Sequence, residues 1–366
     1  MPYVDALKAV ASQFIVLHHL AAYGPMSDVV YEHAAGLFDW LYHDARMAVQ
    51  VFFVVGGFLA ARTLAPGGVA AFSSPLALLW RRYCRLAIPY VTAILISVGA
   101  AAVARAWMEH ESVPGTPTLS QFLSHVFLLH DVLGYEALSA GVWYVAIDFQ
   151  LFGLMVALLW VARPSGAAGA SHRWASPLLL WLTAIASLLY FNRNADWDVW
   201  ALYFVAAYVL GALAYWASER THSALWLGAL AAVALLSVVV DFRPRILIAL
   251  AVAITIGVAR RTGVPARWPT VPLLSFLGRI AYSVFLVHFP VCMLINAAVF
   301  RFFGADPVAN LVGLFIAWGA SIGAGWLLYH LVESRTERLL TKGSLASSPH
   351  DKSLEYALET PVETPR

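Results

Sequence analysis

The chain has 366 residues, of which 61% are hydrophobic and 12% are charged, and its formal net charge is +2. About a quarter of the residues of a soluble globular domain are charged, so this composition excludes an ordinary soluble domain. It predicts an all-α, polytopic transmembrane helical bundle in a lipid bilayer. The small net charge argues against a nucleic-acid partner.

Windows of about 20 apolar residues predict about ten membrane spans. The expected spans are 4–23, 46–64, 84–106, 143–162, 176–192, 199–217, 223–240, 245–259, 273–298 and 308–332. Cytoplasmic loops of membrane proteins carry an excess of Lys and Arg. In this chain most basic loop residues lie on the side of the membrane that also holds both termini, so both termini are expected in the cytoplasm. Residues 1–340 form the predicted transmembrane domain, and the polar residues 341–366 are expected to be a disordered cytoplasmic tail.

The first expected span carries two ionisable side chains on one face. Lys8 and His19 are eleven residues apart, which on a helix brings them to nearly the same direction, about 16 Å apart along the axis. An ionisable residue inside a membrane marks a functional site by default. The alternative is that Lys8 extends to the interface and His19 hydrogen-bonds to a neighbouring helix.

The second and third spans carry weaker signals. Gly56 and Gly57, in VFFVVGGFLA, allow another backbone or a ligand to come close, although simple helix packing explains them as well. Arg82 and Arg85, in WRRYCRLAIPY, are three residues apart at the expected cytoplasmic end of a helix. Such a pair can bind phosphate groups or can merely anchor the helix at the interface.

The fourth span begins with Trp143 and Tyr144 and places Asp148 about one turn below the outer interface. A buried carboxylate needs a partner because its unpaired charge is costly in an apolar medium. His19 or Arg46 could supply that partner. A structural ion pair and a catalytic role for Asp148 both remain open at this point.

The ninth span repeats the pattern of stacked ionisable groups. Arg279 stands at its cytoplasmic start and His288 nine residues later, with Pro290 just beyond. At the end of the last span, Glu333 could pair with Arg82 or Arg279. The histidine pairs 18/19 and 125/130 lack a third convergent ligand, so no metal is expected.

Taken in order, these segments resemble the acyltransferase-3 family of integral membrane acyltransferases, which includes bacterial O-antigen and exopolysaccharide acetylases. The resemblance spans about residues 3–340 and rests on Asp5, Lys8 and His19 followed by FFVVGGFL, RRYCR, WYVAIDFQ and LGRIAYSVFLVHFP. The family's basic-x10-His motif falls on Lys8 and His19, its R-x-x-R on Arg82 and Arg85, and its W-x-x-x-x-acid on Trp143 and Asp148. The family commonly has Arg in place of Lys8 and Glu in place of Asp148.

The resemblance implies an enzyme of the inner (plasma) membrane that moves an acyl group, usually acetyl from cytoplasmic acetyl-CoA, to a hydroxyl of a cell-envelope or lipid-linked glycan. The expected catalytic residues are His19 as base and Asp148 as the group that orients or stabilises it. Lys8, Arg82, Arg85 and Arg279 are expected to bind CoA, and Trp143, Tyr144 and His288 to contact substrate.

This prediction requires one continuous cavity from the arginines to His19. Direct transfer and a transient acyl-histidine both fit these residues. A transporter or flippase, and a sensor without turnover, remain the alternative functions. The sequence carries no signal for oligomeric state.

Overall fold

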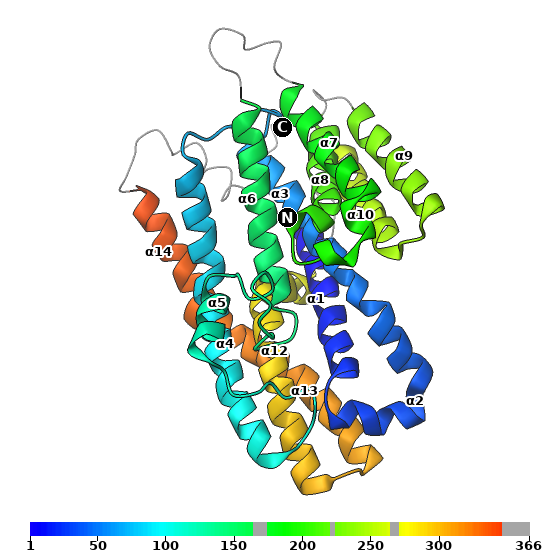
Figure 1. The fold of residues 1–366 in the computed structure, drawn as a ribbon, viewed down its shortest axis with the longest axis vertical. Helices are drawn as coiled ribbons and strands as arrows, with labels where there is room; N and C mark the ends of the chain where they lie inside the picture. The colour runs from blue at the N-terminus through cyan, green and yellow to red at the C-terminus, as the bar shows by residue number, and fades with distance from the viewer. Residues whose placement is uncertain (164–173, 220–223, 264–270, 346–366) are drawn as a thin grey trace.

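A computed structural model describes residues 1–163, 174–219, 224–263 and 271–345, which form helices, short helical turns and loops without a strand (Figure 1). The helices are α1 (Pro2–Ala22), α2 (Pro25–His43), α3 (Val49–Leu64), α4 (Pro75–Trp107), α5 (Leu119–Val126), α6 (Trp143–Val161), α7 (Ala175–Leu189), α8 (Ala201–Ser218), α9 (Leu225–Val240), α10 (Pro244–Thr262), α12 (Pro272–Phe303), α13 (Pro307–Leu328) and α14 (Ser334–Leu345).

Each of the ten expected spans coincides with a helix, and the predicted fold class is confirmed. Among the described residues, seven helical segments are long and apolar enough to cross a bilayer. Three of the ten expected spans, α1, α9 and α10, fall outside this set. Helix α9 is short, α1 contains several polar residues, and α10 has three arginines at its ends.

The structure changes two expected boundaries. Helix α4 begins at Pro75, well before the expected start of that span at residue 84, with Ser74 as its N-cap. At the C-terminal end, α13 continues through a π-helical turn, Tyr329–Glu333, into α14, which ends at Leu345. Helix therefore extends past the expected domain end at residue 340, and most of the predicted tail, 346–366, lies outside the described residues.

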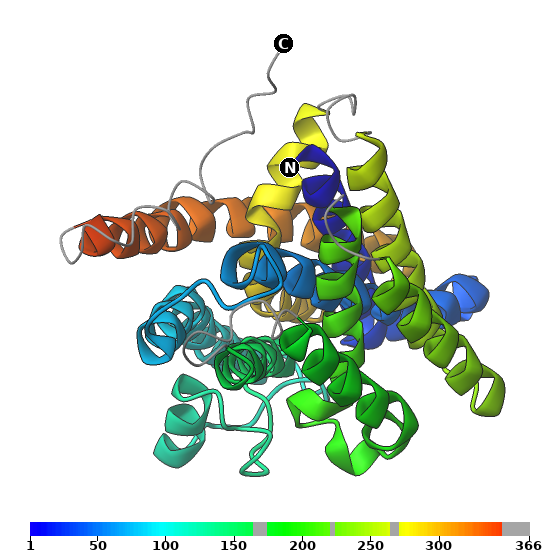
Figure 2. The ribbon, with the colours of Figure 1, turned by 90° about the horizontal axis from the view of Figure 1, so that it is seen from above.

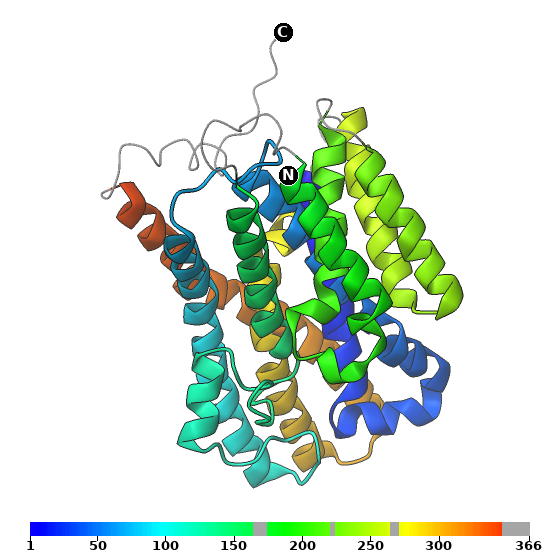
Figure 3. The same cartoon turned by 45° about the horizontal axis from the view of Figure 1, so that its top comes forward.

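Figure 3 shows that the ends of α3, α6 and α8, the start of α4 and the N-terminus lie towards the same end of the bundle. These are the ends from which the sequence predicts the cytoplasmic loops to leave. The opposite end holds the α1–α2 connection and the α12–α13 connection. This arrangement is the one that the predicted orientation requires.

Two glycines let α3 and α8 pack backbone against backbone. A Cβ on Gly57 would overlap the backbone carbonyl of Tyr208, and a Cβ on Gly211 would overlap that of Val54. Small residues permit such close approach between membrane helices. The helix-packing explanation for Gly57 in the sequence is therefore confirmed.

Helix α12 packs against α1, α4 and α13 and so joins the helices that carry the candidate site. Gly278 on α12 lies against the backbone of Asp5, which brings α1 and α12 together next to Lys8 and Arg279. Viewed from above, α13, the π turn and α14 run as one long helical rod past α12 and α4 (Figure 2).

Candidate active site

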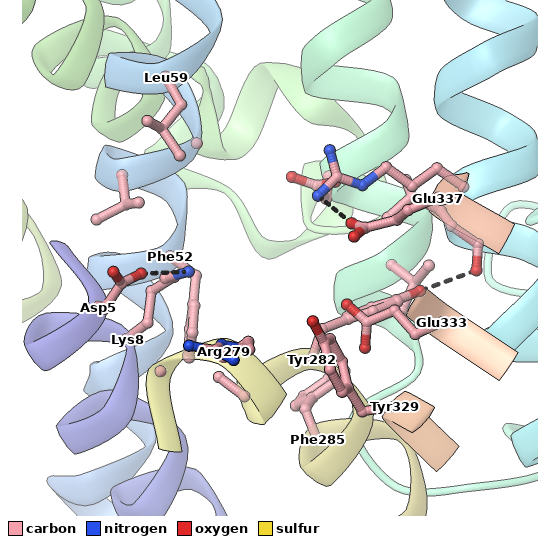
Figure 4. A pocket seen from close by; sticks show the side chains of 18 of the residues that line it. Asp5, Lys8, Phe52, Leu59, Arg279, Tyr282, Phe285, Tyr329, Glu333 and Glu337 are labelled. Atoms are coloured by element: carbon pink, nitrogen blue, oxygen red, sulfur yellow. Dashed lines mark hydrogen bonds and ion pairs between the residues drawn. The ribbon is translucent and has the colours of Figure 1, made fainter. Parts of the chain in front are cut away.

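A cavity of about 560 Å³ opens between α1, α3, α4, α6, α12 and the α13–α14 rod (Figure 4). One part of its wall is charged and includes Asp5, Lys8, Arg82, Arg85, Asp148, Arg279, Glu333 and Glu337. Another part is aromatic and includes Phe52, Tyr144, Tyr282 and Phe285. Its volume falls within the range of small-molecule sites, which is about 300–1,000 Å³.

Six of the nine site residues expected from the sequence line this cavity. They are Lys8, Arg82, Arg85, Tyr144, Asp148 and Arg279. The other three, His19, His288 and Trp143, are not among the lining residues. The indole of Trp143 instead packs parallel to the ring of Phe204, with centroids 5.5 Å apart, in the interface with α8.

Arg82 and Asp148 form an ion pair inside the bundle. One guanidinium nitrogen of Arg82, Nη2, lies 2.5 Å from Oδ2 of Asp148, whose side chain is only 5% exposed. The prediction of His19 or Arg46 as the partner of Asp148 is therefore wrong. Because α4 begins at Pro75, Arg82 lies two turns into the helix and not at its end.

Arg85 faces a different partner from Arg82. Its guanidinium lies 2.6 Å from Oε1 of Glu337 on α14, and its side chain is half-exposed. The two arginines of the R-x-x-R motif therefore do not form one free phosphate-binding pair, because each has its own carboxylate. The sequence does not predict a role for Glu337, because the last span is expected to end at residue 332, whereas α14 continues the helix past Arg85.

The remaining two cations of the cavity differ in their contacts. Lys8 pairs with Asp5, one turn before it on α1, at 3.1 Å. Arg279, an exposed residue two turns into α12, has no hydrogen bond or ion pair within the described part of the chain (Figure 4). Of the four cations, Arg279 can therefore bind an incoming anion without breaking a contact seen here.

Glu333 is buried and accepts a hydrogen bond from the hydroxyl of Ser283, with 2.5 Å between the oxygens. The predicted pairing of Glu333 with Arg82 or Arg279 is wrong. The hydroxyl of Ser283, which carries no charge signal in the sequence, takes that place on α12.

Lys8 and His19 share the continuous helix α1, and both face the bundle interior as predicted: Lys8 lines the cavity and His19 contacts His288 on α12. The ring of His19 is 7% exposed, and its Nδ1 lies 2.6 Å from Nε2 of His288. The two rings are inclined by 13° with centroids 4.8 Å apart, which fits a hydrogen bond in the shared plane of the rings. The structure thus gives His19 an imidazole partner from α12, and not the carboxylate of Asp148 that the sequence analysis expected.

The surroundings of His288 fix the proton positions in this pair. Its Nδ1 lies 2.6 Å from the carbonyl oxygen of Phe285, which can only accept, so Nδ1 carries the hydrogen. In a neutral pair, Nε2 of His288 then accepts the hydrogen of His19 Nδ1. Nε2 of His19 is left with a free lone pair and can act as a base.

The segment between α5 and α6 packs on α4 and at Gly141 comes close to His19. The hydroxyl of Ser97 on α4 donates to the carbonyl of Leu138, and Nε2 of His125 accepts from the Leu138 amide. His130 packs on His125 with ring centroids 4.2 Å apart, and burial lowers the pKa of His130 to about 3. No cluster of three His, Cys, Asp or Glu side chains that could hold a metal is found in the described ranges.

The comparison with protein families decides the class of this site. Residues 1–330 match the acyltransferase-3 family, which is described as an acyltransferase domain. The chain belongs to the acyltransferase-3 family. The resemblance inferred from the sequence is confirmed, and the protein is a multi-pass membrane acyltransferase. Searches of curated proteins and of solved structures gave no match.

Proposed function

We propose that this acyltransferase transfers an acetyl group from cytoplasmic acetyl-CoA to a hydroxyl of a cell-envelope or lipid-linked glycan at the plasma membrane. The observation that carries the proposal is a cavity with four cations in its wall whose aromatic part adjoins the His19–His288 pair. CoA is a polyanion with a long, narrow arm. Its phosphates suit a wall in which Arg279 is unpaired, as far as the chain is described, and other cations can exchange carboxylate for phosphate, and its arm suits the aromatic part.

The charged wall accounts for donor binding. Arg279 makes the first contact with the phosphates, because it is exposed and has no partner among the described residues. Lys8 and Arg85 extend this cationic surface after exchanging their carboxylate partners for phosphate. Arg82 contributes less charge, since Asp148 neutralises it, and the pair forms a polar wall along the path of the pantetheine arm.

The histidine pair accounts for the chemistry. Nε2 of His19 takes the proton of the acceptor hydroxyl while the hydroxyl oxygen attacks the carbonyl carbon of the thioester. The new C–O bond forms, the C–S bond breaks, and the leaving thiolate takes the proton from the imidazolium. His288 is a positioning residue, because it accepts the Nδ1 hydrogen of His19 and holds Nε2 available for the substrate.

Donor binding in detergent tests the first half of the proposal. Acetyl-CoA at about 100 times its Kd adds about 2.7 kcal/mol to the stability of a protein that binds it, and this raises the Tm. Arg279→Ala should reduce the shift strongly. Arg301→Ala, at the opposite end of the same helix, is the matched control and should leave the shift unchanged. No shift in the wild type would contradict the proposal and favour a transporter or flippase.

His19→Ala tests the second half. This variant should keep the acetyl-CoA shift and lose acetyl transfer, because His19 does not line the cavity but supplies the base. Full activity in this variant, with correct membrane insertion, would refute the assignment of the base. Mass spectrometry of envelope glycans from cells with and without the gene identifies the acceptor.

A further inference from the structure

The ring of Phe285 borders the cavity and lies close to His19, which does not line the cavity. It lines the cavity and is 7% exposed. The edge of this ring, Cε2 and Cζ, lies 3.2 Å from the point where a Cβ on Gly141 would stand, and Cε1 of His19 lies 3.1 Å from the same point. The Phe285 edge and His19 are therefore no farther apart than the sum of these two distances.

Other groups hold the Phe285 ring in this place. Tyr144, which also lines the cavity, meets it edge to face with centroids 5.4 Å apart. The ring of His288 lies 6.0 Å from it on α12, and the Phe285 carbonyl accepts the Nδ1 hydrogen of His288. Gly141, with a φ of +78°, brings the chain before α6 close to the rings of Phe285 and His19, where a Cβ would make contacts of 3.1–3.2 Å that are tighter than usual.

We infer that the Phe285 ring is a specificity-determining partition, which separates the donor cavity from His19 until the thioester displaces it. This inference rests on the proposed function. In the conformation described here, cavity water and the acyl group meet the aromatic face of Phe285 before they can reach Nε2 of His19. The predicted continuous cavity from the arginines to His19 is not found, because His19 does not line the cavity, and the Phe285 partition accounts for this separation.

The partition has two consequences for the reaction. The ring fills the cavity wall next to His19, so a short acyl group fits beside it and a long one does not. The ring also keeps water from replacing the acceptor. Without it, the water oxygen attacks the thioester carbon, His19 carries the water proton to the leaving thiolate, and the products are acetic acid and CoA thiol.

The test measures thiol release from acetyl-CoA and hexanoyl-CoA by the purified full-length protein in detergent without acceptor. Phe285→Ala should release thiol about tenfold faster than the wild type. It should also lose the preference for the acetyl donor, since one methylene group in a tight pocket is worth about 10- to 200-fold. Phe285→Leu should give an intermediate result and serves as the main variant if the alanine protein does not fold.

Two further variants make the result specific. Phe289→Ala removes an equally buried ring one turn along α12 that packs on Tyr23 and does not line the cavity, so it should behave as the wild type. Phe285→Ala combined with His19→Ala should return thiol release to background, because the leak requires the base.

The outcomes separate this inference from the proposed function. If acetyl-CoA stabilises the Phe285 variants while thiol release and chain-length preference stay at wild-type values, the partition is refuted and donor binding stands. If acetyl-CoA fails to stabilise even the wild type, the proposed function fails first, and the partition fails with it.

Discussion

Replacing His288 tests whether a second imidazole, and not a carboxylate, positions the base. His288→Leu removes the acceptor of the His19 Nδ1 hydrogen and leaves a buried donor unpaired. Such a group costs about 1–3 kcal/mol. The His19 ring avoids this cost by adopting the other tautomer or orientation. Its Nε2 then no longer presents a lone pair to the substrate. The productive arrangement then becomes rarer by about 5- to 150-fold, and kcat should fall by that factor.

The assay is acetyl transfer at saturating and limiting acetyl-CoA, which separates kcat from KM. The KM for acetyl-CoA should stay unchanged, because His288 does not line the cavity. His288→Gln should recover much of kcat, since its carbonyl oxygen can accept the same hydrogen. His18→Ala is the control, because His18 bonds to the Leu41 carbonyl and lies outside the pair. An unchanged kcat in His288→Leu, or a loss expressed only in KM, would refute the reasoning.

Three other changes follow from the contacts of the bundle. Glu337→Ala removes the carboxylate that neutralises one arginine of the cavity, so titration calorimetry should show a Kd for acetyl-CoA lower by about 1.5- to 5-fold; a higher Kd would contradict this. Asp148→Asn leaves Arg82 without its counter-charge, which costs about 3–5 kcal/mol and lowers the Tm in detergent. A double change to Arg82→Met and Asp148→Leu should recover the Tm, and failure to recover would show that the two residues are not coupled. Gly211→Ala places a Cβ against the backbone of α3 and should lower the Tm, whereas Gly99→Ala, with open space around it, should not; equal shifts would argue against the close packing.

Features that depend on one helix were predictable from the sequence. The ten helices that coincide with expected spans follow from runs of apolar residues. The shared direction of Lys8 and His19 follows from helical periodicity. Gly57 was recognised as a site of close approach before its partner on α8 was known. In each case the evidence lies within about 20 consecutive residues.

Features that depend on two helices were not predictable. The sequence predicts Arg82 at the end of a span because Arg81, Arg82 and Arg85 interrupt the apolar run of α4, whereas α4 begins at Pro75 and buries Arg82 against Asp148. The partners His288 and Ser283 both lie on α12, and which helix they face depends on how α12 is rotated against α1 and α13. Hydrophobic patterning gives no information on this rotation once a helix is apolar all round.

The choice of a histidine partner for His19 has an electrostatic consequence. A carboxylate next to His19 would place a charge in an apolar bundle throughout the catalytic cycle, and the desolvation of such a charge is costly unless it is paired. Asp148 avoids that cost through its ion pair with Arg82. In the proposed mechanism the His19–His288 pair is neutral before reaction, so it acquires charge only when the acceptor proton moves to His19. The imidazolium then lies beside the negative charge that develops on the thioester oxygen. The attraction between these two charges stabilises the transition state more than the ground state.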